Sequence, residues 1–186
     1  MAIEDLLAIL QPPAKPVEVR GNDNRKQVEQ TLGLALPDDF WEYGERFGSG
    51  KIVYSDVKSA IDLMIYNPYS SAYQAGVTAD CDTLRTLKQS SSGDQIPYDV
   101  FPDKPGLLSW GNDVNGNTYY WLTEGSRNSW PLIIFDVNAY DNAFERFDMS
   151  MTSFLSKILD RAILPAMWQG ADFFSVRSGI SFRPGY

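Results

Sequence analysis

The sequence predicts an α+β fold in which one twisted, mainly antiparallel sheet is backed by helices. Two apolar and aromatic runs, at about 107–111 and 117–123, flank the polar dipeptide Asn115-Gly116. Both residues of this dipeptide tolerate positive φ, so the pattern is typical of a β-hairpin with a type I′ turn. Apolar residues recur at helical spacing before and after the hairpin, which predicts the helices that cover the sheet.

Composition indicates one soluble globular domain. The chain has 186 residues, of which 44% are hydrophobic and 22% are charged. Its net charge of -8 argues against binding nucleic acid through phosphates and permits a basic protein partner. The N-terminus lacks the basic start of a signal peptide, and no run approaches the ~20 apolar residues of a membrane span. With Cys81 as the single cysteine, we expect a reducing, cytoplasmic location and no membrane association.

The chain contains no histidine. Ser-His-Asp and Cys-His catalysis are therefore excluded in their usual form, and so are most zinc and non-haem iron sites. Cys81 falls on the apolar face of a predicted helix, so we interpret it as a core residue and not as a reactive thiol. We expect no catalytic residues, no metal and no cofactor.

Helices are predicted from apolar spacing and from end signals, over 1–10, 25–32, from Pro37 to Phe47, over 69–89 and over 149–164. Pro37 stands at the favoured first helical position, and Asp38 and Asp39 follow in the first turn, where carboxylates complement the helix dipole. The aromatic stripe of this helix predicts a side that faces the core and consists of Phe40, Tyr43 and Phe47. In the last helix, either Ser150 or Thr152 is the predicted cap.

Strands are predicted over 51–54, 61–66, 107–111, 117–123, 130–137 and 144–148, and 88–106 is predicted to be a long loop. Gly48-Ser49-Gly50-Lys51 resembles a phosphate-binding loop, but Glu45 and Ile52 occupy the places where that motif needs Gly and Ser or Thr. We therefore interpret it as a turn from helix to strand.

The chain divides into three parts. Residues 1–22 are an N-terminal segment with a proline-rich linker, 23–164 form the α+β domain, and 165–186 are a tail packed on that domain.

The hairpin turn shares residues with calcium-binding loops. If such a loop began at Asp113, Gly116 would be its fourth residue and Glu124 its twelfth. An EF-hand needs its glycine at the sixth position, so we interpret the segment as a turn. Carboxylate pairs could also serve a hydrolase, although the sequence brings no two of them into an apolar cleft.

Alternation along the second hairpin strand places Asn117, Tyr119 and Trp121 on one face and Tyr120 and Leu122 on the other. One face packs on the helices, and the other is either also core or is offered to a partner. In the second case, this face and the acidic loops form a protein-binding surface. The candidate residues of that surface are Asp56, Asp62, Asp94, Asp99, Asp103, Asp113, Asn115, Asn117, Tyr119 and Trp121.

Four segments follow one another in a recognisable order: Leu32 to Phe40, Gly48 to Gly50, Gly106 to Trp121, and Phe147 to Leu155. They contain a helix ending in Leu-Gly, a helix start at Leu-Pro, a glycine-rich turn, a Gly-Asn-Asp hairpin and a closing Phe-Leu helix. Over roughly 24–164 the chain resembles the SUKH superfamily, which includes fungal Smi/Knr-type cell-wall assembly regulators and many bacterial toxin-immunity proteins. The chain departs from the family at Asn117, where Asp is common.

The resemblance implies a twisted sheet backed by helices and a binding role without catalysis. It implies an immunity protein that binds and neutralises a cognate toxin, such as a nuclease or deaminase effector, and an acidic chain suits a basic nuclease. The alternatives are a regulatory scaffold of the cell-wall assembly type and a carboxylate-dependent hydrolase. The partner's identity and the oligomeric state stay open.

Overall fold

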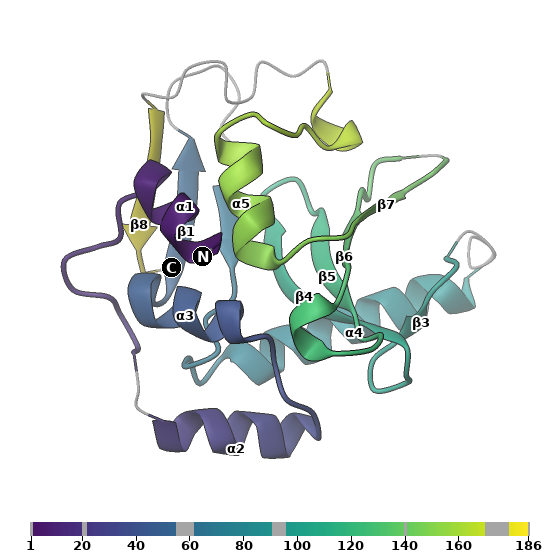
Figure 1. Cartoon of the computed structure of the whole chain (residues 1–186). Helices are drawn as coiled ribbons and strands as arrows, with labels where there is room; N and C mark the ends of the chain where they lie inside the picture. The colour runs from purple at the N-terminus through teal and green to yellow at the C-terminus, as the bar shows by residue number, and fades with distance from the viewer. Residues whose placement is uncertain are drawn as a thin grey trace.

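The computed structural model describes residues 2–19, 22–54, 62–90, 96–139, 141–169 and 179–185. These residues form one open, mainly antiparallel sheet flanked by helices (Figure 1), which confirms the predicted fold class. The helical elements are α1 (Ala2–Ile9), α2 (Asn22–Leu32), α3 (Asp38–Phe47), α4 (Tyr73–Gln89), α5 (Met151–Leu159) and the short 3-10 turns η2 (Arg127–Ser129) and η3 (Ala166–Trp168). The strands are β1 (Gly50–Tyr54), β2 (Asp62–Ile65), β3 (Asp99–Val100), β4 (Gly106–Asp113), β5 (Thr118–Leu122), β6 (Leu132–Phe135), β7 (Phe144–Phe147) and β8 (Ile180–Pro184).

The strands lie in the order β7-β6-β5-β4-β2-β1-β8, and β3 makes a short parallel pair with β4. Along one edge β4 pairs with β5, and along the other it pairs with β2 and β3. Two strands differ from the sequence-based expectation. β3 lies within the predicted loop 88–106, and β8 lies within the predicted tail, where it pairs with β1 along its whole length.

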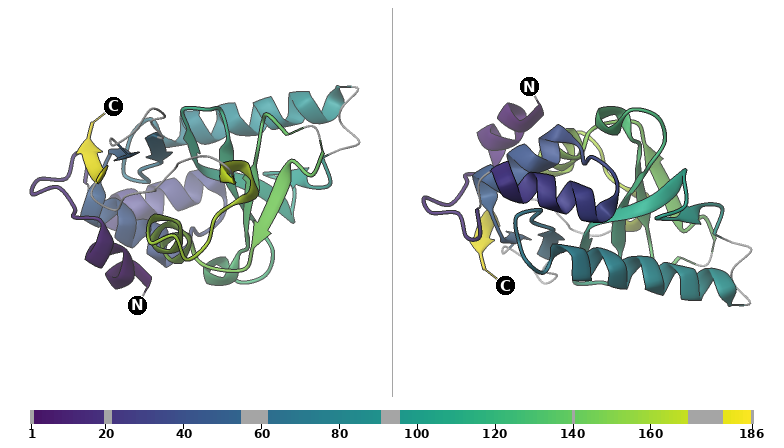
Figure 2. Two further views of the ribbon diagram at one scale, coloured as in Figure 1. Left: turned by 90° about the horizontal axis from the view of Figure 1, so that it is seen from above. Right: turned by 90° about the horizontal axis from the view of Figure 1, so that it is seen from below.

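Helices cover both sides of the sheet. Figure 2 shows α4 along one side and α1 with α5 on the other. α1 packs against α5, and α3 contacts both. Ile3, Leu6 and Leu10 are buried, so the N-terminal segment contributes side chains to the core of the α+β fold. Among the residues described, none of the helices combines the length and apolar character needed to cross a bilayer.

Aromatic rings join α3 and α5 to the hairpin. The rings of Phe40 and Trp121 meet edge to face at 4.9 Å, and those of Trp110 and Phe154 do so at 6.2 Å. Such pairs contribute ~0.5–1.5 kcal/mol beyond the burial of their area. Phe40, Tyr43 and Phe47 are all buried, which confirms that the aromatic stripe of α3 faces the core.

The β4–β5 hairpin is confirmed, but its turn is not of type I′. Positive φ occurs at Gly116 (88°) and not at Asn115. Gly116 N–H donates to the carbonyl of Asp113 at 3.1 Å, and Asp113 N–H donates to the carbonyl of Asn117 at 3.0 Å. This is the three-residue loop in which a turn is followed by a left-handed glycine.

Side-chain caps connect α3 to α5. Ser150 Oγ accepts from Ser153 N–H at 3.4 Å, which confirms one of the two predicted caps of α5. The other, Thr152, donates its N–H and hydroxyl to Asp39 Oδ2 at 2.9 and 3.0 Å. Asp39 therefore satisfies the first turn of α5 from the start of α3. Pro37 is the N-cap of α3, one position before the predicted one.

Asp38 holds α2, α3 and η2 together. Its Oδ1 accepts from Arg25 Nη2 at 2.6 Å and from Arg127 Nη2 at 2.9 Å, and its Oδ2 accepts from Asn128 Nδ2 at 2.9 Å. These donors, with the hydrogen bond from Arg25 the strongest, lower the pKa of Asp38 to about 2. The ionised carboxylate therefore stabilises the folded state.

We expect the free energy of unfolding to fall as pH decreases from about 4 to about 2. A folded-state pKa of about 2 lies below the ordinary value of 3.8, so the stabilisation is complete above pH 3.8 and is lost as pH falls through the folded pKa. The Asp38 side chain is 45% exposed, and solvent screening limits the contribution to ~1 kcal/mol or less. Urea unfolding across this pH range should give a shallower pH dependence for Asp38→Asn than for wild type, with Asp148→Asn as the control. Identical slopes for Asp38→Asn and wild type would contradict this assignment.

Candidate functional site

Asp113, one of the predicted contact residues, is a buried carboxylate at the hairpin end that accepts hydrogen bonds from the turn and from β5. Its Oδ1 accepts from the N–H groups of Asn115 and Asn117 at 2.8 and 3.2 Å. Its Oδ2 accepts from Asn117 Nδ2 at 2.9 Å and from the Tyr119 hydroxyl at 2.8 Å. Both oxygens are occupied by protein donors, which supports the interpretation of this segment as a turn and not as a calcium loop.

Three further residues predicted to contact a partner are buried and do not lie on an exposed face. Asn117, Tyr119 and Trp121 are 3%, 1% and 1% exposed. The opposite face of β5 is also covered, because Tyr120 and Leu122 are buried. The interpretation that both faces of the strand are core is therefore correct, and Asp113, Asn117, Tyr119 and Trp121 do not lie on the exposed face expected from the sequence.

The other described candidates lie at opposite ends of β4. Asp62 and Asn115 are beside the hairpin turn, where Val114 N–H donates to the Asp62 carbonyl at 3.3 Å. Asp99 pairs with Gly106 at the start of β4, and Asp103 is exposed nearby. A strand of this length separates the two groups by roughly 20 Å. Lys51 pairs with Asp62, and Lys88 Nζ lies 2.7 Å from Asp99 Oδ1. Asp56 and Asp94 are outside the described residues.

A small hollow of about 190 Å³ beside the β6–β7 turn has three carboxylates in its lining, those of Asp136, Asp141 and Glu145. Asp136 Oδ1 accepts from Asn138 N–H at 2.9 Å, and Glu145 Oε2 accepts from Ala166 N–H at 2.7 Å. These two carboxylates therefore stabilise local backbone. The part of the chain that is described holds no group of three His, Cys, Asp or Glu side chains suited to a metal ion.

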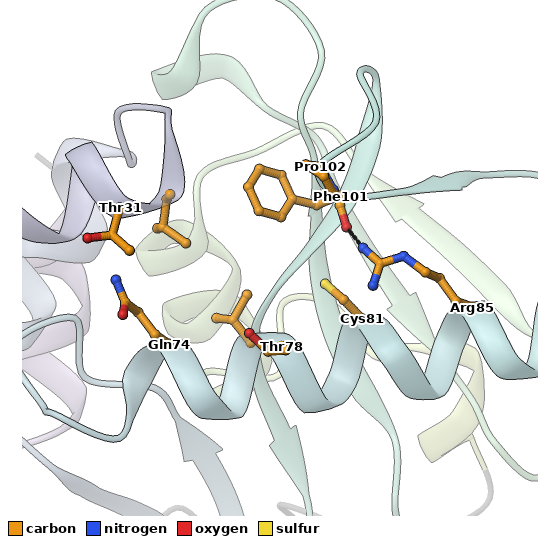
Figure 3. A pocket seen from close by; sticks show the side chains of 9 residues that line it. Thr31, Gln74, Thr78, Cys81, Arg85, Phe101 and Pro102 are labelled. Atoms are coloured by element: carbon orange, nitrogen blue, oxygen red, sulfur yellow. Dashed lines mark hydrogen bonds between the residues drawn. The ribbon is translucent and has the colours of Figure 1, made fainter.

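A cleft of about 290 Å³ lies between the end of α2, one side of α4 and the segment after β3 (Figure 3). Its lining residues are Thr31, Leu32, Gln74, Val77, Thr78, Cys81, Arg85, Phe101 and Pro102. Arg85 donates through Nη1 to Asp82 Oδ1 at 2.6 Å and through Nη2 to the Phe101 carbonyl. Arg85 thus holds the segment after β3 against α4.

The thiol of Cys81 lies at this cleft but is poorly suited to react. Cys81 is 2% exposed, and burial raises the pKa of its thiol to about 11. Its Sγ lies 3.8 Å from the Leu107 carbonyl, which it donates to. At neutral pH the thiol is protonated and packed in the core, as the helical spacing predicts.

A larger hollow of about 450 Å³, which we name the α4–β2 groove, lies between the end of β2 and the first turns of α4. Its lining consists of Met64, Tyr66, Asn67, Ser70, Ala72, Tyr73, Ala75, Gly76 and Asn112. The lining is mostly apolar and includes no carboxylate. Ala72, Ala75 and Gly76 have little or no side chain, so this part of α4 leaves room for groups from outside.

One end of the α4–β2 groove is polar. The Tyr66 hydroxyl donates to Asp80 Oδ2 at 2.6 Å and accepts from Asn112 Nδ2 at 2.9 Å. Burial is the main cause that raises the pKa of Asp80, and burial followed by the hydrogen bond to Asp80 raises the pKa of Tyr66. Tyr66 is therefore a protonated donor beside a carboxylate whose charged form is destabilised by burial.

Fold and surface together define an α+β domain with an open apolar groove. Comparisons with protein-family models, with curated proteins and with solved structures returned no match. Asp80 is not among the residues predicted from the sequence, although its helical neighbours carry a signal. The residues three and four positions away on the same helix are Gly76, Val77, Thr83 and Leu84, so no helical neighbour supplies a cation.

Replacing Asp113 with Ala should lower the free energy of unfolding by roughly 3 kcal/mol or more, because buried donors of Asn117 and Tyr119 lose their acceptor. Asn115→Ala, at the exposed tip of the same turn, should change it by less than about 0.5 kcal/mol. Urea unfolding measures both. A stable Asp113→Ala variant that lost partner binding would instead make Asp113 a contact residue.

Cys81 should react with a thiol reagent such as DTNB at least 100-fold more slowly in the native protein than in urea at pH 8. Burial limits access, and a thiol with a pKa of about 11 is mostly protonated at that pH. Absorbance at the thionitrobenzoate maximum follows the reaction. Equal rates in the two states would place the thiol at an open surface.

Proposed function

We propose that this chain is a non-catalytic protein-binding domain, and that it acts as an immunity protein that binds and neutralises a cognate toxin. The α4–β2 groove is the observation that carries the proposal. It is open, it is lined mostly by apolar side chains and by the aromatic rings of Tyr66 and Tyr73, and no carboxylate or thiol lines it. Such a surface suits the burial of side chains from another protein.

Charge supports a basic partner. The net charge of -8 gives long-range attraction for a positively charged protein and repels the phosphates of nucleic acid. Complementary charge raises association rates and favours the correct partner. The order of motifs that resembles the SUKH superfamily agrees with the same kind of function, and nuclease or deaminase toxins are the class of partner it suggests.

The chemistry of the described cavities also favours binding. The cleft beside Cys81 holds a protonated thiol and an arginine that is already bound to Asp82 and Phe101. In the hollow beside the β6–β7 turn, Asp136 and Glu145 accept from backbone N–H groups. A specific arrangement for a hydrolase is therefore less well supported than a surface for a partner.

A tagged form of the full chain should capture a basic toxin-like protein from its native host, and co-expression with the toxin gene should restore growth. The association rate should fall about tenfold between low and high salt, because steering between opposite charges is screened. Surface plasmon resonance measures the rate, with an unrelated protein of similar negative charge as the control. Recovery of metabolic enzymes alone, together with no protection against any neighbouring toxin gene, would refute the proposal.

A further inference from the structure

Asp80 is a partly buried carboxylate without a cation. Among the ion pairs of the described chain, none includes Asp80. The groups beside it are neutral hydroxyls: that of Tyr66, which donates to Asp80 Oδ2 at 2.6 Å, and that of Ser109. Carboxylates removed from water are normally paired with a positive charge, because desolvation of the charged form is costly. Among the described residues, Asp80 therefore has hydroxyl neighbours but no cation to balance its charge.

Asn112 has a buried acceptor without a donor among the described residues. Its Nδ2 donates to the Tyr66 hydroxyl at 2.9 Å, and this hydroxyl donates onward to Asp80. Because Asn112 donates through Nδ2 to Tyr66, its Oδ1 points elsewhere. This oxygen is buried and has no donor among the described residues. A buried carbonyl oxygen without a donor costs free energy until a donor arrives.

The α4–β2 groove leads to these two acceptors. Ala72, Gly76 and Asp80 are spaced by four residues, so they follow one another along the same side of α4. Ala72 and Gly76 line the groove, and the Tyr66 ring lies over Gly76, where an ideal Cβ would be 3.4 Å from Tyr66 Cζ. Tyr66 and Asn112 line the groove, and Asp80 is joined to them through the Tyr66 hydroxyl, so this polar group stands at the groove wall.

We propose that the α4–β2 groove receives an arginine side chain from the partner protein. Its aliphatic stem would pack on Met64 and Ala75, and its guanidinium would reach Tyr66, Asp80 and Asn112. A guanidinium offers a positive charge and several N–H donors in a planar fork, which suits a carboxylate without a cation and a carbonyl oxygen without a donor among the described residues. The Tyr66 ring adds a cation–π surface. The inference rests on the proposed protein-binding function and names the chemistry of the partner.

The charge and shape of the groove favour arginine over other occupants. An anionic side chain would be repelled by Asp80, and an apolar one would leave Asp80 without a cation and Asn112 Oδ1 without a donor. Net charge alone draws any cation to the surface, so a test must separate recognition in the groove from general attraction.

The full chain labelled with 15N is titrated with the capped peptide acetyl-Leu-Arg-Leu-amide, and amide shifts are followed by NMR. The control peptide replaces arginine with citrulline, which has the same shape and no charge. We expect the arginine peptide to shift the amides of Tyr66, Gly76 and Asn112 and to bind at least tenfold more tightly than the citrulline peptide. Asp80→Asn should abolish this difference, whereas Asp82→Asn, on the far side of α4, should preserve it.

Equal affinity of the two peptides, or shifts spread over the acidic surface and unchanged in Asp80→Asn, would overturn the inference. Asp80→Asn keeps an acceptor for Tyr66 and removes an unpaired charge, so its thermal stability should match wild type. If Asp80→Asn does not fold, a second variant, Ala75→Phe, tests the inference. Its phenyl ring fills the groove from an exposed position of α4.

Ala75→Phe should weaken the arginine peptide at least tenfold, and Ala79→Phe, at an exposed position one turn away and outside the groove, should not. The same pair of variants separates the two proposals once a toxin is captured. If wild type and Ala75→Phe bind the toxin equally, the groove inference fails and the immunity function stands. If wild type captures no toxin, the immunity function fails, and the peptide titration still decides whether the groove selects arginine.

Discussion

The β4–β5 hairpin is buried on both faces, and this constraint determines how the rest of the chain must pack. β4 is hydrogen-bonded to neighbours along both edges, and side chains of both hairpin strands are covered by helices. A polar group in such a place must find its partner within the protein. Asp113 meets this requirement at the hairpin end by accepting from Asn115, Asn117 and Tyr119. The turn, the strand register and the aromatic core are therefore stabilised by the same carboxylate.

α3 connects the sheet to the surrounding helices. Phe40 packs on Trp121 of β5, and the two carboxylates at the start of the helix point to different neighbours. Asp38 binds Arg25 of α2 and Arg127 of η2, while Asp39 binds the N-terminal turn of α5 through Thr152. These two residues complement the dipole of their own helix, and they also position three other segments that are distant in sequence.

Local patterns in the sequence predicted most elements, and non-local pairing accounts for the differences. The Ser150 cap and the hairpin follow from short-range signals. The turn type does not, because the Asp113 side chain accepts from Asn115 and Asn117 N–H and so stabilises a longer loop than Asn115-Gly116 suggests. β8 has a weak strand pattern of its own and depends on β1 for its pairing. Alternation along β5 showed two aromatic faces but could not show that helices cover both.

The candidate groove could not be found from spacing because its parts come from β2, α4 and β4, which meet only in the fold. Four segments carry the resemblance to the SUKH superfamily, and they supply the hairpin, the start of α3 and α5, which are core elements. Met64, Tyr66, Ala75, Gly76 and Asp80 all lie outside those segments. Asn112, however, lines the groove from within one of those segments, and the lining residues Tyr73 and Asn67 are buried, so groove and core overlap at these three positions. If the groove binds a partner as proposed, substitutions at positions such as Met64 and Ala75 would alter it while the buried network around Asp113 stays intact.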